Sequence, residues 1–209
     1  MPHRSIALCA GVLGLAASAG WAQDGSNVKL DSPEGRVLLV TEQPHGKNAM
    51  HEHKINRVMI YLGDGRMRFT TAAGKTETIE FKAGDVRWSP AEGPHTSESI
   101  GDKPFQIVEI ELKNKPSSSG KISSDLDPLK VDAKHYKLEF ENDQVRVLRV
   151  HFGPNEKGVL HEHKLKHWVV YLNDQARGKK GEVRLDEAMT HTEQNPLDHD
   201  VERIAVDIK

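Results

Sequence analysis

The chain has 209 residues, of which 36% are hydrophobic and 29% charged, and its formal net charge is -2. This composition is ordinary for a globular protein and excludes collagen, a coiled coil and wholesale disorder. Because there is no long basic run, the sequence lacks the electrostatic footprint of a nucleic-acid binder, and a small-molecule ligand or another protein is the expected partner. The chain contains 12 histidines, several of them in pairs one residue apart, which points to metal chemistry.

Residues 1–22 have the pattern of an export signal peptide. Arg4 supplies the positive charge, residues 6–19 form an apolar run, and Gly20 and Ala22 offer small side chains for cleavage. The run is shorter than the roughly 20 residues that a membrane-spanning helix needs. We therefore expect cleavage after Ala22, no membrane association afterwards, and a periplasmic or secreted protein. Cleavage also removes Cys9, the only cysteine, so metal ligands must be His, Asp or Glu.

After the signal, the first half of the chain consists of short β-forming runs separated by turn residues. The expected strands cover residues 37–40, 58–62, 67–71, 76–81, 86–88 and 105–112. In the last of these, Glu109 and Glu111 alternate with apolar residues, which predicts a half-buried strand. No segment after residue 22 has a convincing helical period, so we predict an all-β fold.

The second half of the chain repeats the first. Residues 36–40 align with 146–150, residues 51–54 with 161–164, and residues 61–62 with 171–172, all without a gap. Further on, residues 84–87 align with 181–184 and residues 95–96 with 191–192 at a smaller offset. The second copy is therefore shortened, and the loss lies between Leu172 and Gly181.

A polar, serine-containing segment separates the two copies. It predicts a first domain over residues 27–113, a linker over 114–134 and a second, shortened domain over 135–209. Each domain is near the lower limit of independent stability, so we expect the two to pack together.

Each copy carries three histidines in the same arrangement. His51 and His53 lie two residues apart, so on a strand both imidazoles face the same side, and His95 from a later strand completes a facial set. The second copy repeats this set with His161, His163 and His191. One such pair arises easily by chance, but the repeated set favours metal ligands over polar surface histidines.

With these motifs the sequence resembles the cupin superfamily, and specifically its two-domain members, the bicupins. The residues that match the family's two motifs in the first copy are Gly46, His51, His53, Gly63, Gly84, Pro90, Gly93 and His95. In the second copy they are His161, His163, Gly181, His191 and Asn195, while Gly158 lies later than the family's first glycine. The resemblance covers nearly the whole chain after the signal. It implies two tandem jelly-roll barrels, the second shortened, with a metal bound inside.

The sequence departs from the family pattern at the glutamate that normally follows the histidine pair. Arg57 stands there in the first copy and His167 in the second. Arg57 cannot ligate a metal. It either contacts a carboxylate or enolate of a substrate, or is a surface arginine paired with Glu52 or another acid. His167 would complete a four-histidine metal set. The expected cofactor is a divalent transition metal: iron, nickel, zinc, manganese or copper.

Three classes of function agree with these residues. The first is a metal-dependent enzyme, of oxygenase, isomerase or lyase type, acting on a small organic acid or carbonyl compound. It is favoured because open coordination positions would face an apolar barrel. The others are a non-catalytic periplasmic protein that binds a metal or small ligand, and a structural dimerisation module. Fold alone does not choose among them. Open strand edges in the shortened copy suggest a homodimer.

Overall fold

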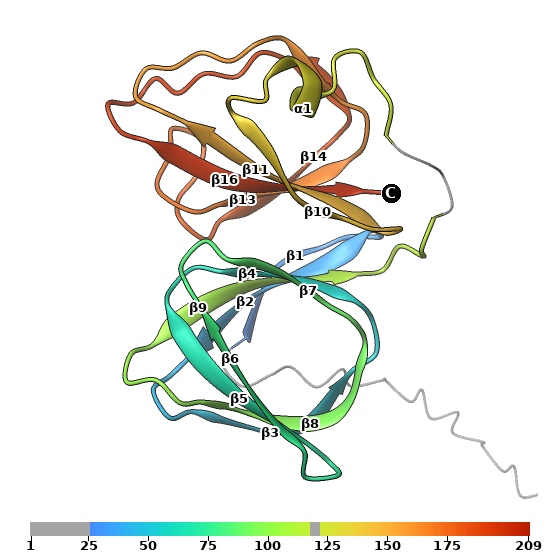
Figure 1. Cartoon of the computed structure of the whole chain (residues 1–209), viewed down its shortest axis with the longest axis vertical. Helices are drawn as coiled ribbons and strands as arrows, with labels where there is room; N and C mark the ends of the chain where they lie inside the picture. The colour runs from blue at the N-terminus through green and yellow to red at the C-terminus, as the bar shows by residue number, and fades with distance from the viewer. Residues whose placement is uncertain (1–25, 118–121) are drawn as a thin grey trace, which may run out of the picture.

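The computed structural model describes residues 26–117 and 122–209, so the expected signal peptide and its cleavage site lie outside the described residues. The described chain forms two β-rich halves, blue to green and yellow to red in Figure 1. The predicted all-β class is confirmed. Within the described ranges there is a single short helix, α1 (Pro128–Val131), capped by Asp127, whose side chain accepts a hydrogen bond from the Leu129 amide.

No helix of the described part of the chain is long and apolar enough to cross a membrane.

The first half is a jelly roll made of two antiparallel sheets. The five-stranded sheet has the order β1 (Ser26–Asp31), β2 (Gly35–Glu42), β9 (Phe105–Leu112), β4 (Arg57–Tyr61) and β7 (Val86–Ser89). The four-stranded sheet has the order β3 (Lys47–His53), β8 (Glu92–Ser99), β5 (Gly65–Thr71) and β6 (Thr76–Phe81). All six strands expected from the sequence are present.

The second half repeats this plan with fewer strands. Its five-stranded sheet has the order β10 (Tyr136–Glu141), β11 (Val145–Phe152), β16 (Val201–Ile208), β13 (His167–Tyr171) and β14 (Val183–Asp186). The opposing sheet has only β12 (His161–His163) and β15 (Met189–His191). Residues 172–182 connect β13 to β14 directly, in the place of β5 and β6 of the first half. The predicted shortening of the second barrel is confirmed.

The largest hydrophobic core lies between the two five-stranded sheets and is shared by both halves. Its buried residues include Val37, Val58, Ile60, Val108, Ile110, Val145, Val147, Trp168, Val170 and Ile204. Gly35 lets the two halves approach closely, because a Cβ there would lie 2.8 Å from the Trp168 ring and 2.6 Å from the Glu111 carbonyl oxygen. The two halves therefore pack together, as expected for domains too small to be independently stable.

The prediction that strand 105–112 is half-buried is wrong. One face of β9 packs into the shared core, and the other face lines the inside of the first barrel. Glu109 is only 2% exposed and lies on this inner face. Alternate residues of β9 do lie on opposite faces, but both faces are covered.

Candidate metal centres

The histidine triad of the first barrel lies on two neighbouring strands of the smaller sheet. His51 on β3 is directly opposite His95 on β8, and the register is irregular on both sides of His51. Such irregularities redirect side chains at functional sites. The ring nitrogens of His51, His53 and His95 lie within 4.8 Å of one another. This arrangement fits one divalent metal ion.

The second barrel reproduces the triad on its two-stranded sheet. His161 on β12 is opposite His191 on β15, and ring nitrogens of His161, His163 and His191 again lie within 4.8 Å of one another. The structure places His167 in a second group, with His163 and Asp207, under the same limit. Among the described residues no such group contains all four histidines. The four-histidine set expected from the sequence is instead two overlapping groups that share His163.

Backbone hydrogen bonds orient four of these imidazoles in the same way. In each case Nδ1 lies within hydrogen-bond distance of the carbonyl oxygen two residues earlier; the four are His51 (2.7 Å), His95 (2.9 Å), His161 (2.9 Å) and His167 (3.1 Å). A carbonyl only accepts, so Nδ1 must carry the proton and the lone pair remains on Nε2. The donor set therefore offers neutral nitrogen ligands, of which Nε2 of His161 lies 2.9 Å from the Tyr136 hydroxyl. In addition, His191 Nε2 is buried and has no hydrogen-bond partner.

Five of the seven imidazoles are held in the neutral form that metal binding requires. Burial, with Arg57 nearby, lowers the pKa of His53 to about 3. Burial also lowers the pKa of His191 to about 4, despite the opposing effect of Glu193. The pKa values of His51, His161 and His167 are lowered too, again mainly by burial. At neutral pH these nitrogens are free of competing protons.

The first triad opens into a cavity of about 320 Å³ that is lined by apolar side chains and by charged ones of both signs: Arg57 and Arg87, with Glu42, Glu77, Glu92 and Glu109. Arg57 is buried and not on the surface. Its Nη1 lies 3.1 Å from Glu109 and its Nη2 donates to Ser89 at 2.8 Å. Its acidic partner is therefore Glu109, whereas Glu52 pairs with a neighbouring lysine.

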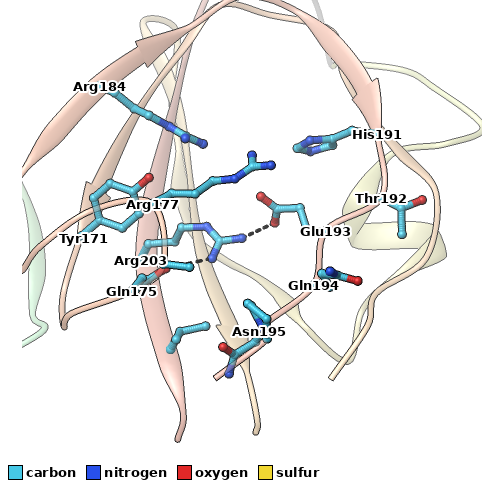
Figure 2. Close-up of a pocket in the computed structure, with 13 residues that line it drawn as sticks. Tyr171, Gln175, Arg177, Arg184, His191, Thr192, Glu193, Gln194, Asn195 and Arg203 are labelled. Carbon is cyan, nitrogen blue, oxygen red and sulfur yellow. Dashed lines mark hydrogen bonds and ion pairs between the residues drawn. The ribbon is translucent and has the colours of Figure 1, made fainter. Parts of the chain in front are cut away.

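The second cavity, of about 480 Å³, is lined in part by residues 175–177 of the segment that replaces β5 and β6. Figure 2 shows Arg177, Arg184 and Arg203 extending into it opposite His191 and Glu193. Arg203 forms an ion pair with Glu193, which also accepts a hydrogen bond from the Tyr136 hydroxyl at 2.5 Å. Burial raises the pKa of Glu193, but Arg203 and Tyr136 outweigh it and hold the value at about 2. Glu193 is therefore a carboxylate.

One cationic feature is common to both cavities. Arg87 lies over the Tyr61 ring at 5.7 Å, and its repeat counterpart Arg184 lies over the Tyr171 ring at 5.8 Å. The first cavity is lined by Arg87 together with all three imidazoles of its triad, and the second by Arg184 together with His191. In the second cavity three arginines, Arg177, Arg184 and Arg203, face a single glutamate, so this cavity can accept an anion next to a metal ion.

Several residues of these sites were missed by the sequence analysis. Arg87 and Arg184 belong to the repeated segments used for alignment, and that repetition was the signal that could have identified them. Glu109 and Asp207 carried no local signal, because their partners come from distant strands.

Comparison with known proteins supports the cupin resemblance. No family model matches the chain. Oxalate decarboxylase OxdC of Bacillus subtilis (strain 168) is 33% identical over 89 residues, which are 42% of this chain and 23% of that protein. The chain therefore matches less than a quarter of this relative's length.

Solved structures extend the similarity to most of the chain. AerE from Microcystis aeruginosa has a TM-score of 0.61 at 12% identity, covering 84% of this chain and 88% of its own. An OxdC mutant from Bacillus subtilis has a TM-score of 0.59 at 13% identity, covering 84% and 69%. A cupin 2 conserved barrel domain protein from Leptotrichia buccalis has a TM-score of 0.52 at 17% identity, covering 88% of both. At these identities the comparisons show the fold, which is that of the cupins.

Proposed function

We propose that this chain is an exported bicupin that binds a divalent transition metal through its histidine triads and acts as a metal-dependent enzyme on a small organic acid. The observation that carries the proposal is the convergence of three imidazoles in each barrel beside a cavity, with an excess of arginines in the second cavity. A metal ion at a triad would act as a Lewis acid on a carboxylate or carbonyl oxygen. The arginines would supply a second contact for a negatively charged substrate.

The size of both cavities, and the excess of arginines in the second, favour a small anion. Volumes of about 320 and 480 Å³ suit a small molecule, and the guanidinium groups of Arg87 and Arg184 are held over tyrosine rings beside the imidazoles. The name of the curated relative, an oxalate decarboxylase, agrees with a carboxylate substrate. The proposed reaction is an oxygenation, an isomerisation or a bond cleavage, and an activity assay distinguishes them.

Arg57 is proposed to contact the substrate in the first barrel. It lines the cavity together with His51 and His53, and its Nε is buried without a hydrogen-bond partner. Glu109 holds the guanidinium in place through Nη1. Arg57→Ala should therefore weaken binding of a carboxylate while leaving the metal content unchanged.

The second candidate function is non-catalytic binding of a metal or small ligand in the periplasm. The observation in its favour is that the triad of the first barrel has no carboxylate in its group of ligand atoms. In addition, the charge of Arg57 is already matched by Glu109. Such a site could hold a ligand without turning it over.

Turnover separates the two candidates. The full chain is produced with its signal, purified from the periplasm without added metal, and supplied separately with each of the five candidate metals. Oxygen uptake and loss of substrate are then followed for a panel of mono- and dicarboxylates and carbonyl compounds. Metal-dependent turnover supports the enzyme, whereas stable metal binding without turnover across the panel supports the binding protein. Retention of full turnover by the His51→Ala/His163→Ala variant, which removes one ligand from each triad, would contradict the proposed site.

We further propose that the chain forms a homodimer. The sheet of β12 and β15 has only two strands, so one edge of β15 has no strand partner within the described residues. Unpaired edges favour pairing with another chain. Light scattering of the purified protein tests this, and a monomeric mass across the micromolar range would contradict it.

A further inference from the structure

The second barrel contains a buried group of charges that do not balance. Arg146 is 3% exposed and forms two ion pairs, from Nε to Asp207 at 2.8 Å and from Nη1 to Asp127 at 2.6 Å. Asp207 and Asp127 are 1% and 5% exposed. Two carboxylates therefore share one guanidinium, and the group carries one net negative charge. A buried charge without a partner is costly, so a cation is expected close by.

The corresponding group in the first barrel is balanced. The strand registers place Arg36, Glu111 and Arg57 side by side in the first barrel and Arg146, Asp207 and His167 side by side in the second. In the first barrel Arg36 pairs with Glu111 at 2.5 Å, and Arg57 pairs with Glu109 at 3.1 Å. Two cations thus meet two anions. The first barrel has a built-in cation, Arg57, at the position where the second barrel has the neutral side chain of His167.

Ligand atoms without partners surround this position in the second barrel. His163 Nδ1 and Asp207 Oδ1 are both buried without a hydrogen-bond partner, and they lie 3.8 Å apart, too far for a hydrogen bond. His167 uses Nδ1 for the Leu165 carbonyl, so its Nε2 lone pair is free. One ligand atom from each of His163, His167 and Asp207 lies within 4.8 Å of the others.

We propose that a divalent transition metal binds between His163, His167 and Asp207, beside the strand position at which the first barrel carries Arg57. Two imidazole nitrogens and a carboxylate oxygen form a set suited to iron(II) and related ions. The ion supplies the positive charge that the Arg146 group lacks.

This position is distinct from the triad of the second barrel, although both include His163. A neutral imidazole has one free lone pair, so His163 serves either the triad through Nε2 or the new position through Nδ1. The two positions are alternatives for one ion. The inference does not depend on the proposed enzymatic activity, since it rests on the charge balance of the Arg146 group.

The test uses the full mature chain with both triads disabled. His51→Ala and His53→Ala remove the first triad, and His161→Ala and His191→Ala remove the second while leaving the new position intact. After treatment with a chelator, this four-substitution variant is titrated with Zn²⁺ or Co²⁺ in equilibrium dialysis with elemental analysis. We expect it to bind one ion per chain and to show a higher melting temperature with the ion than without it.

Two additional substitutions, each made in this variant, isolate the position. His167→Arg installs the residue that the first barrel uses, and we expect it to abolish binding in a chain that remains folded by circular dichroism. Asp207→Asn should lower the affinity at least tenfold. His199→Ala, which removes an exposed histidine outside every ligand group, is the control and should change neither property.

No binding by the folded four-substitution variant would overturn the inference, as would binding that survives both His167→Arg and Asp207→Asn. If that variant does not fold, the single variant His167→Arg in the otherwise unchanged chain provides the second test. Without metal, the His167→Arg variant should be at least as stable as the unsubstituted protein, because the added guanidinium balances the net negative charge of Arg146, Asp207 and Asp127. A loss of stability there would count against the inference. Absence of turnover by the unsubstituted protein would contradict the proposed enzyme and leave this position unaffected.

Discussion

The buried pair of Arg57 and Glu109 makes a quantitative prediction about the first barrel. The two charged groups lie 3.1 Å apart, and their side chains are 7% and 3% exposed. At an effective dielectric constant of about 20, Coulomb attraction at this distance is about 5 kcal/mol. Burial raises the pKa of Glu109 by more than the nearby Arg57 lowers it, so the net shift is upward. The cost of removing the two charges from water therefore offsets their attraction. The pair is therefore costly to break but contributes little net stability.

Glu109→Gln keeps the shape of the side chain and leaves the charge of Arg57 without its partner. We expect the free energy of unfolding to fall by about 3–5 kcal/mol. For a protein of this size that corresponds to a melting temperature lower by roughly 6–20 °C. The double variant Arg57→Leu/Glu109→Leu removes both charges and should recover most of the loss. Urea unfolding followed by circular dichroism measures both effects.

The exposed pair of Glu52 and Lys54 provides the matched control. Its side chains are 46% and 81% exposed, so Glu52→Gln should change stability by no more than about 1 kcal/mol. The reasoning is refuted if Glu109→Gln costs no more than this control. It is equally refuted if the double variant is as unstable as Glu109→Gln.

Three further predictions concern the shared core, pH and export. Trp168→Ala empties a fully buried site between the two barrels and should destabilise the protein by about 3–5 kcal/mol in urea unfolding, whereas a loss below 1 kcal/mol would contradict the shared core. In the folded protein the pKa values of His53 and His191 are about 3 and about 4. In the unfolded chain these histidines take up protons below about pH 6.5, whereas in the folded chain they do not. The metal-free protein should therefore lose stability as the pH falls from 7 to 4. A His53→Ala/His191→Ala variant should show a flatter dependence in urea unfolding at each pH, and an equal slope would argue against the effect. Mass spectrometry of the exported protein should find Gln23 at the N-terminus, and an intact N-terminus would contradict cleavage after Ala22.

The sequence was sufficient to predict the fold because its signals are local and occur twice. The alternation of residues within short runs identified six strands of the first barrel, and the internal repeat predicted the same strand arrangement for the second barrel. Alternation could not show that β9 is covered on both faces, since that depends on the packing of one barrel against the other. For this reason Glu109 was expected near solvent and is found inside the barrel.

The candidate sites could be predicted from the sequence only in part. The histidine triads were visible because each pair is adjacent along a strand and the whole set recurs. The separation of His167 from His161 and His191 could not be predicted, because it depends on where β13 lies relative to β12 and β15. Asp207 was missed because it meets His163 and Arg146 only when the last strand pairs with β11 and β13.

Metal stoichiometry tests the central claim, that the histidine groups are metal sites, most directly. The full chain is purified without chelators and analysed for iron, nickel, zinc, manganese and copper, beside a variant carrying His51→Ala, His53→Ala and His163→Ala. These substitutions disable the first triad and, through the shared His163, both groups of the second barrel. We predict at least one transition-metal ion per chain in the parent protein and none in the folded variant. A parent protein that binds no metal even when it is supplied, or a variant with the parent's metal content, would contradict the account.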